Sequence, residues 1–284
     1  MNWENLIVNL ECVDTLPTLP TVFTKVSELI AKPNVTAKQL AEVIQTDQAI
    51  SMKLLKIVNS PFFGFSRKIM TVQDAVVLLG FNATKNTVMS ISIFRALNHG
   101  NTVSGFNMKD FWKHSIATGL IARYLARKLH VDAEKAFSAG IVHDIGKIIL
   151  QQYFQDELEK VLSVIAEKKI SFYEAELEVY RGTHCDLGSY LADKWNLPLP
   201  LIEVIDLHHT PGEATEDPRL VSIVHIANIL CKGMGLDFAE TSPNKEIDSY
   251  AFARLDLSAE EIEKWLEEIQ NEVDQAEEMF KNIQ

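Results

Sequence analysis

The 284-residue sequence lacks basic clusters and long apolar runs. No run of Lys and Arg is longer than a pair such as Lys168-Lys169, and the formal net charge is -12. A protein that binds along a nucleic acid needs basic side chains to neutralise many phosphates, so we expect no long nucleic acid as a partner. No apolar stretch reaches the 18 residues of a membrane span, and the chain does not open with a secretion signal. We therefore expect a cytoplasmic protein with no membrane partner.

Cysteine is scarce. Cys12, Cys185 and Cys231 are odd in number, widely spaced and form no C-x-x-C pair, which favours free thiols in a reducing compartment. Cys185 stands beside His184, where a sulfur can act as a metal ligand, whereas an isolated cysteine is more often a small buried apolar residue. Both interpretations of Cys185 stay open.

The sequence also lacks sustained alternation of apolar and polar residues, the pattern of a half-buried strand. Apolar residues instead recur at helical spacing, for example within 22–30, 40–44, 50–58 and 72–79. Two glycines and several turn formers between Asn98 and Gly105 mark a lobe boundary. The sequence therefore predicts an all-α fold with two helical lobes, residues 1–100 and residues 101–284.

The second lobe is predicted to contain a continuous helix near 135–153 and a long carboxy-terminal helix. Ser258 and Glu261 form the pattern of a capping box at the start of the latter helix. An apolar stripe then follows along one face, made of Ile262, Trp265, Leu266, Ile269, Val273, Ala276 and Phe280. This stripe must pack against the body of the chain or against a partner helix, and intramolecular packing is the commoner arrangement.

Histidine is concentrated in the second lobe. Five of the eight histidines are His114, His143, His184, His208 and His209, and Asp144 directly follows the second of them. Neutral imidazole is the commonest ligand for transition metals, and a carboxylate beside it can bridge two ions about 3.5–4 Å apart. The pattern predicts a site for divalent metal ions.

The pair His143-Asp144 carries most of this prediction. It lies between the apolar segments 141–142 and 148–150, where two polar side chains are costly unless they are paired or bind a metal. The preceding residues, Ser138-Ala139-Gly140, are small enough to let another helix approach. Lys147 follows one turn after His143, where its ammonium can meet a phosphate oxygen, offset Asp144 or lie in solvent.

The other histidines are less specific when taken singly. His114 shares a helical face with Ile121 and Leu125, which by itself is typical of a core histidine. His208-His209 ends a predicted helix, where both rings can be aimed at a site, but doubled histidines at such an end also occur as surface residues.

Together these residues resemble a known family. The set His114, His143-Asp144, His184 and His208-His209 is similar to that of the HD superfamily of metal-dependent phosphohydrolases, and closest to its HD-GYP branch. In the amino-terminal lobe, Leu16-Pro17-Thr18-Leu19-Pro20, Asn59-Ser60-Pro61-Phe62-Phe63-Gly64 and Ala75-Val76-Val77-Leu78-Leu79-Gly80 resemble the signature of HDOD domains, bacterial signalling modules related to HD-GYP proteins. The resemblance covers nearly the whole chain and implies an HD-type helical metal-site subdomain.

By this resemblance the metal ligands are His114, His143, Asp144, His184, His208 and His209, with Asp144 bridging. Asn228 stands where the family pattern has an aspartate, so it is a weak ligand that has lost a negative charge. The loop after His209 also lacks the Gly-Tyr-Pro segment of the active phosphodiesterases. A donor set of five imidazoles and one carboxylate is too rich in nitrogen for magnesium or calcium, and it favours one or two ions of iron first, then manganese, zinc or nickel.

Three functional hypotheses remain open from the sequence. The first is a signal-transduction protein whose metal-loaded pocket binds a phosphorylated small molecule without turnover and acts on a signalling protein partner. The second is a metal-dependent phosphohydrolase, acting on nucleotides or cyclic dinucleotides, in which two metals activate a water at Asp144 and Lys147 steadies the phosphoryl group. The third is a scaffold with vestigial histidines. Asn228 and the missing Gly-Tyr-Pro segment favour the first over the second, and the six retained ligand positions argue against the third.

Overall fold

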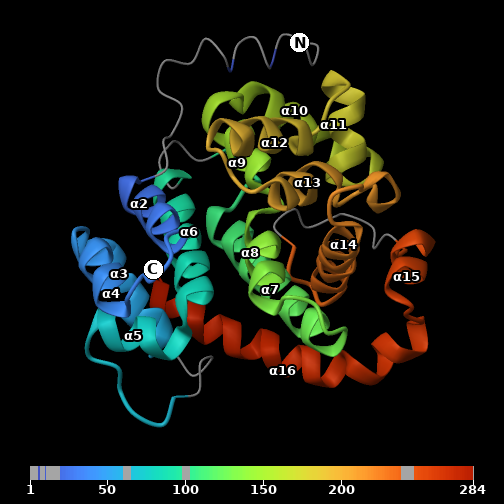
Figure 1. The fold of residues 1–284 in the computed structure, drawn as a ribbon. Coiled ribbons are helices and arrows are strands. Elements are labelled where there is room, and N and C mark those ends of the chain that lie inside the picture. The colour runs from blue at the N-terminus through green and yellow to red at the C-terminus, as the bar shows by residue number, and fades with distance from the viewer. Residues whose placement is uncertain are drawn as a thin grey trace. The chain divides into compact units, whose positions relative to one another are not determined.

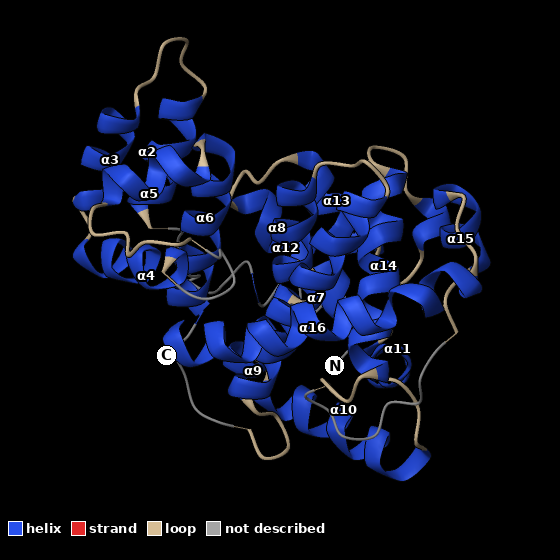
Figure 2. Cartoon of the chain, turned by 90° about the horizontal axis from the view of Figure 1, so that it is seen from below, coloured by secondary structure: helices blue, strands red, loops and turns tan. Residues whose placement is uncertain are grey.

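The computed structural model describes Leu6, Leu10 and residues 20–59, 65–97, 103–237 and 246–283, the last nine of these through their backbone only. Every regular element in these segments is a helix, and none of the described residues lies in a strand (Figure 2). The predicted all-α fold class is confirmed. The helix order along the chain can be followed in Figure 1.

The chain divides into two compact units. One contains residues His99–Glu267 with Met1–Leu16, and the other contains Pro17–Asn98 with Glu268–Gln284. The long helix α16 (Ala259–Ile283) thus contributes residues to both units. The predicted lobe boundaries, 1–100 and 101–284, stay a prediction, because several of the residues between 98 and 105 lie outside the described part of the chain.

Three of the helices described in the unit that begins at Pro17 have a side-chain cap at the amino terminus. Its helices are α2 (Thr21–Ile30), α3 (Ala37–Gln45), α4 (Gln48–Val58), α5 (Val72–Leu79) and α6 (Phe81–Leu97). Thr36 and Gln39 form a capping box on α3, Asp47 caps α4 and Thr71 caps α5. Asn59 follows α4 and bonds both backbone groups of Ile69, at 2.7 and 2.8 Å. We expect a turn at Asn59-Ser60-Pro61 from the sequence, and Ser60 and Pro61 lie outside the described residues.

The other unit carries the histidines. Its helices are α7 (Met108–Lys128), α8 (Ala133–Val142), α9 (Ile145–Tyr153), α10 (Gln155–Lys168), α11 (Phe172–Tyr180), α12 (His184–Lys194), α13 (Leu199–Leu207), the 3-10 turn η2 (Pro211–Glu213), α14 (Pro218–Gly233) and α15 (Ser249–Leu255). Helix α7 packs against α8 and α14, while α12 packs against α9 and α13. These four contacts bring the helices that carry the predicted site together.

Two of these helix contacts depend on glycine. A Cβ atom on Gly140 of α8 would lie 2.6 Å from the Cα of Gly119 in α7, as the small Ser138-Ala139-Gly140 segment predicted. A Cβ atom on Gly146 of α9 would lie only 1.8 Å from the carbonyl oxygen of His184 in α12. Backbone approaches this close exclude any side chain. Glycine therefore sets how near α7 and α12 come to the His143-Asp144 segment between them.

The structure corrects the continuous helix predicted near 135–153. Helix α8 ends at Val142 and α9 begins at Ile145, so His143-Asp144 forms the junction between two helices. The Nδ1 of His143 bonds the carbonyl of Gly140 at 2.7 Å, which takes an acceptor that a continuing helix would offer to its own backbone. The helix breaks at the residues with the most polar side chains in this buried segment.

The capping box of the carboxy-terminal helix is confirmed by two hydrogen bonds between Ser258 and Glu261, at 3.0 and 3.3 Å. Ile262, Ile269 and Val273 of the predicted stripe are buried, whereas Leu266 is 39% exposed. The side chains of Ala276 and Phe280 lie outside the described residues.

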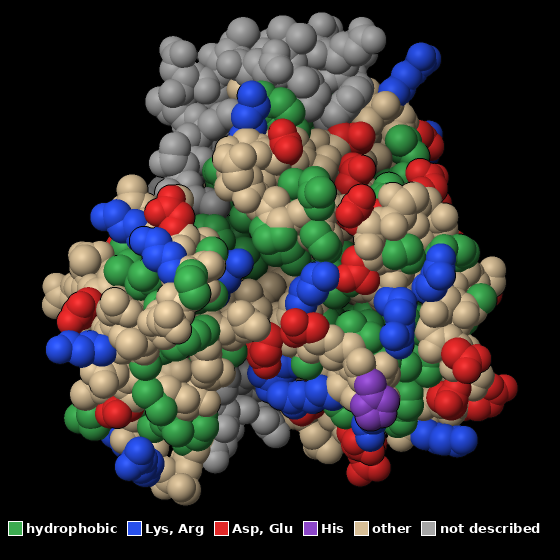
Figure 3. Space-filling model, viewed as in Figure 1, with side chains coloured by type: hydrophobic (Ala, Val, Ile, Leu, Met, Phe, Trp, Pro, Cys, Tyr) green, Lys and Arg blue, Asp and Glu red, His purple; other side chains and the backbone are tan. Residues whose placement is uncertain are grey.

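The exposed surface mixes both charge signs. On the face drawn in Figure 3, Lys and Arg side chains alternate with Asp and Glu side chains, with apolar groups between them. Within the described segments, no helix combines the length and the apolar character needed to cross a bilayer.

Candidate metal centre

The structure brings together side chains that are far apart in the sequence. His114 comes from the second turn of α7, His143-Asp144 from the junction of α8 and α9, His184 from the first turn of α12, and His208 from the end of α13. All five side chains have zero exposure to solvent. Burying four imidazoles and a carboxylate in one place is unfavourable unless they bind one another or an ion.

The first half of the cluster surrounds the Oδ2 atom of Asp144. The Nε2 of His143 lies 3.3 Å from this oxygen, and the Nε2 of His114 lies 3.7 Å from it. The two Nε2 atoms are 3.4 Å apart. These three residues place one donor atom each within reach of a single ion.

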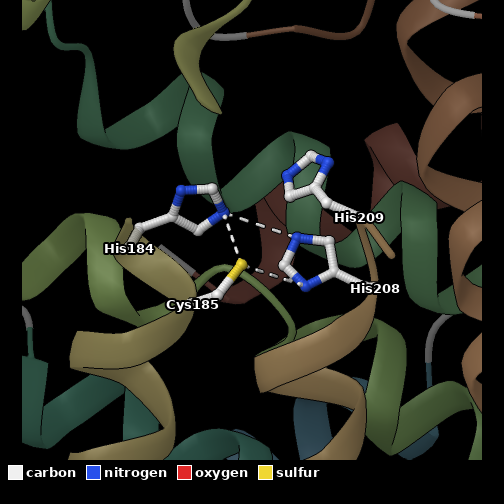
Figure 4. Close-up of side chains that lie close together, drawn as sticks. All are labelled: His184, Cys185, His208 and His209. Atoms are coloured by element: carbon white, nitrogen blue, oxygen red, sulfur yellow. Dashed lines mark hydrogen bonds between the residues drawn. The ribbon is translucent and has the colours of Figure 1, made fainter. Parts of the chain in front are cut away.

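The second half surrounds the Oδ1 atom of the same carboxylate. The Nε2 of His184 lies 3.0 Å from this oxygen and the Nε2 of His208 lies 3.4 Å from it. These two nitrogens are again 3.4 Å apart, and Cys185 and His209 lie beside them (Figure 4). Asp144 thus presents one oxygen to each pair of imidazoles, which is the arrangement of a carboxylate that bridges two ions.

The outward-facing nitrogen of each imidazole has an oxygen partner. In three rings Nδ1 bonds backbone carbonyls: that of Leu236 for His114 at 2.8 Å, that of Gly140 for His143 at 2.7 Å, and those of Val204 and Ile205 for His208 at 3.1 Å. The Nδ1 of His184 instead bonds a carboxylate oxygen of Glu176 at 2.6 Å. Oxygens of these kinds only accept, so Nδ1 carries a proton in each ring. In a neutral ring the Nε2 atom then directs its lone pair inward.

Glu176 of α11 is a site residue that the sequence analysis missed. Its Oε1 accepts from the backbone N–H of His184 at 2.9 Å and from the Tyr180 hydroxyl at 2.7 Å, while Oε2 holds the His184 ring. A signal was present, because Glu176 falls at helical spacing between Phe172 and Tyr180 in an otherwise apolar stripe. An acidic residue there needs a buried partner.

Lys147 contacts the carboxylate directly. Its Nζ donates to the Oδ2 of Asp144 at 2.6 Å and lies 5.0 Å from the centre of the Phe172 ring. The side chain is only 1% exposed. Of the positions considered for Lys147, the structure shows the one that offsets Asp144 and excludes the solvated one.

Asn228 and His209 each contribute an unpaired polar atom. The Oδ1 of Asn228 in α14 and the Nε2 of His209 are buried and have no hydrogen-bond partner among the described residues. Asn228 lies one turn before Cys231, whose sulfur is 3.5 Å from the Nδ1 of His114, so it shares the α14 face that contacts His114. Unpaired buried polar atoms of this kind are suited to a ligand or an ion.

Burial and mutual contact change the pKa values of these groups. Burial lowers the pKa of His114 and of His208 to about 3, and burial with the neighbouring His208 lowers the pKa of His209. For Asp144 burial acts in the opposite direction, but His143 and Lys147 hold its pKa well below the usual value. Burial also opposes the charge on His184, yet Cys185, Glu176 and Asp144 raise its pKa well above the usual value. The cluster therefore holds most of its imidazoles neutral, the form that binds metal.

These residues fit divalent transition-metal ions. Two pairs of Nε2 atoms lie 3.4 Å apart around one carboxylate, and a cation that displaces any proton on them can accept their lone pairs. The separations suit ligands bound at about 2.0–2.1 Å. His114, His143 and Asp144 would hold one ion, and Asp144 with His184, His208 and His209 would hold the other.

Residues 16–211 match the family model of the HDOD domain. This match covers most of the chain, so the chain belongs to the HDOD family. The resemblance inferred from the sequence is confirmed.

Solved structures with the same fold include an HDOD domain protein of unknown function from Geobacter sulfurreducens, with a TM-score of 0.79 and 24% identity over 93% of this chain and 94% of that one. A candidate phosphohydrolase from Shewanella amazonensis SB2B has a TM-score of 0.76 and 23% identity over 97% of both chains. A candidate signal transduction protein from Marinobacter aquaeolei VT8 has a TM-score of 0.80 and 22% identity over 96% of this chain and 61% of that one. At these identities the likeness establishes the fold.

Among curated proteins, an uncharacterized protein of Treponema pallidum is 28% identical over 220 residues, which are 76% of this chain and 42% of the relative. Ribonuclease Y of Thermotoga petrophila is 32% identical over 114 residues, 40% of this chain and 16% of the relative. The chain thus spans less than half the length of these relatives.

Proposed function

We propose that this protein is a cytoplasmic signal-transduction protein of the HDOD family, whose buried histidine centre holds one or two divalent transition-metal ions and binds a phosphorylated small molecule. The observation that carries the proposal is the convergence of four Nε2 atoms on the two oxygens of Asp144, at 3.0–3.7 Å. Iron is the ion we expect first, followed by manganese, zinc and nickel. The state of the centre would be transmitted to a signalling protein partner.

The charges at the centre are the reason for proposing a phosphorylated ligand. A metal ion on Asp144 would neutralise the carboxylate that Lys147 now contacts at 2.6 Å. The ammonium would then be available to a phosphate oxygen, beside an ion that also attracts phosphate. A small phosphorylated molecule fits this combination, whereas the net charge of -12 disfavours a long polyanion.

Binding without turnover is supported by two features. By the resemblance to HD-GYP proteins, Asn228 stands where their pattern has an aspartate, so a neutral amide takes the place of a negatively charged ligand and weakens the hold on an ion. The loop after His209 also lacks the Gly-Tyr-Pro segment of the active phosphodiesterases.

A metal-dependent phosphohydrolase is the second candidate function. It is favoured by the position of Asp144, which presents one oxygen to each pair of imidazoles as a bridging ligand of two ions would. In that case Asp144 would help hold the attacking water and Lys147 would stabilise the phosphoryl group. The two candidate functions differ in whether the protein hydrolyses the phosphorylated molecule that it binds.

The test compares the parent chain with Asn228→Asp and Asp144→Ala, each supplied with iron or manganese, on a generic phosphodiester and on cyclic dinucleotides. If the parent binds without turnover and Asn228→Asp hydrolyses these compounds, the binding function stands and the amide is its cause. Turnover by the parent that Asp144→Ala abolishes would replace the proposal with the phosphohydrolase.

A further inference from the structure

Cys185 lies inside the second half of the histidine cluster. Its sulfur is 3.6 Å from the Nε2 of His184 and 4.0 Å from the Nδ1 of His208 (Figure 4). The side chain is 3% exposed and belongs to the first turn of α12. Two imidazoles, rather than apolar side chains alone, therefore surround this thiol.

Two of the separations in this half of the cluster match those of ligands around one tetrahedral ion. Zinc binds nitrogen at about 2.0–2.1 Å and sulfur at about 2.3 Å, which places two nitrogen ligands about 3.4 Å apart and a sulfur and a nitrogen about 3.6 Å apart. The distance between the Nε2 atoms of His184 and His208 is 3.4 Å. The distance from the Cys185 sulfur to the Nε2 of His184 is 3.6 Å. Both distances therefore equal those expected between two ligand atoms of one tetrahedral zinc ion.

Cys231 is a buried cysteine of the same unit whose contacts differ from those of Cys185. Its sulfur lies 3.5 Å from the Nδ1 of His114, but that nitrogen already bonds the Leu236 carbonyl. The Cys231 thiol itself donates to the carbonyls of His114 and Leu236, at 3.7 and 3.6 Å. Its geometry is that of a protonated thiol, whereas the Cys185 sulfur faces the Nε2 atom that points into the cluster.

We propose that Cys185 is a thiolate ligand of the ion held by His184, His208 and Asp144, and that this half of the centre selects zinc. The inference rests on the proposed metal centre. Binding forms a metal–sulfur bond and breaks the S–H bond, with the proton released to solvent and no change in oxidation state. His184, His208, Asp144 and Cys185 would supply the four ligands of a tetrahedral ion, and His209, whose Nε2 is buried without a hydrogen-bond partner among the described residues, lies beside them.

Two physical effects support a thiolate at this position. Soft sulfur ligands favour zinc over harder ions such as manganese, which prefer oxygen. Cys185 also stands in the first turn of α12, where the helix dipole favours a negative charge. Burial by itself raises the pKa of this thiol, so the thiolate forms when the metal binds. The bridging carboxylate could then join a sulfur-containing site for zinc to a site of His114 and His143 for iron or manganese.

The test is X-ray absorption at the zinc edge on the 284-residue chain loaded with zinc. We expect a sulfur shell at about 2.3 Å, with nitrogen and oxygen at about 2.0–2.1 Å. Cys185→Ser should lose the sulfur shell and bind zinc at least tenfold more weakly, a loss in the range found when metal sites are perturbed. Cys231→Ser is the matched control and should keep both the shell and the affinity.

A second variant keeps the test decisive if Cys185→Ser fails to fold. Cys12→Ser/Cys231→Ser leaves Cys185 as the only cysteine, and its zinc-loaded form should retain the sulfur shell. Zinc bound only through nitrogen and oxygen in the parent would overturn the role of Cys185 while leaving the metal centre intact. A parent that binds no metal of any kind would overturn both proposals.

Discussion

Glu176 fixes the orientation of His184 from behind the ring. Its carboxylate bonds the ring Nδ1 at 2.6 Å and the backbone N–H of the same residue at 2.9 Å, and both side chains are fully buried. A carboxylate in this position holds the ring in the tautomer whose Nε2 faces the metal and makes that nitrogen a stronger donor. Glu176 acts on the centre through His184 and is a positioning residue.

Glu176→Gln should therefore weaken metal binding. The amide keeps the shape of the side chain but loses the charge that supports His184, so we expect metal affinity to fall by about 10- to 100-fold. Titration with a competing chelator measures the change. Glu178→Gln, on the same helix but paired with Lys168 at the surface, is the control. Equal affinities for the two variants would show that Glu176 has no influence on the metal.

At the scale of single residues, the sequence predicts which side chains form the cluster. It does not predict which residues form hydrogen bonds to the outer side of those side chains. The histidines and Asp144 could be found because imidazole and carboxylate are unusual in apolar segments. Glu176 lies eight residues before His184, and His225 bonds the His208 carbonyl at 2.8 Å from another helix. Such contacts depend on how α11 and α14 pack, which spacing along the chain does not reveal.

At the scale of helices, the centre depends on close contacts made through glycine. The small residues before His143 predicted one of them, because Gly140 lies in a segment with no large side chain. The contact of α9 with α12 through Gly146 and Gly188 could not be predicted, since glycine within a helix is compatible with several packing partners. The break at His143-Asp144 was missed for a related reason, because the imidazole takes the Gly140 carbonyl only in the folded chain.

Gly146→Ala should destabilise the fold and disrupt the centre. The added methyl would lie 1.8 Å from the backbone oxygen of His184, and a backbone atom cannot move aside as a flexible side chain can. We expect the free energy of unfolding to fall by roughly 3 kcal/mol and the bound metal to be lost. Urea unfolding and metal analysis provide the measurements.

Gly233→Ala is the control for this variant. No atom lies within 4 Å of a Cβ at Gly233, the last residue of α14, so alanine there should leave stability unchanged or raise it by up to about 1 kcal/mol. If Gly146→Ala unfolds at the same urea concentration as the parent, α9 and α12 are not held together as closely as described.

For the molecule as a whole, the buried imidazoles couple stability to pH. The pKa values of His114 and His208 fall to about 3 in the folded chain, against about 6.5 when unfolded. Below about pH 6.5 the unfolded chain takes up protons that the folded chain does not, so the folded state loses stability down to about pH 3. His184 acts in the opposite sense, because its raised pKa stabilises the fold at low pH and loses that effect as pH rises through the raised value.

The free energy of unfolding of the metal-free protein should therefore fall between pH 6 and pH 4. In this window His184 is protonated in both states, and the neutral buried imidazoles dominate. His114→Asn should reduce the slope by about one proton, because it removes one of the imidazoles whose pKa falls on folding. Urea unfolding at several pH values measures the slope. A stability independent of pH in this range would contradict the burial of neutral rings.

At the largest scale, the fold class and the family could be predicted from the sequence, because helical periodicity and the Leu-Pro and Asn-Ser-Pro segments are local patterns. The assignment of Glu268–Gln284 to the same unit as Pro17–Asn98 could not be predicted from the sequence. An apolar stripe shows that α16 packs, but the stripe carries no information about which part of the chain it packs against.

The most direct test of the account is the metal content of the 284-residue chain purified without added metal. Elemental analysis should find at least one transition-metal ion per chain, with iron expected first, and anomalous scattering should place the ions beside Asp144. Asp144→Asn, which keeps the size of the side chain but removes the shared negative charge, should fall well below one ion per chain. A parent protein with well under one ion per chain, and no difference from Asp144→Asn, would contradict the central claim.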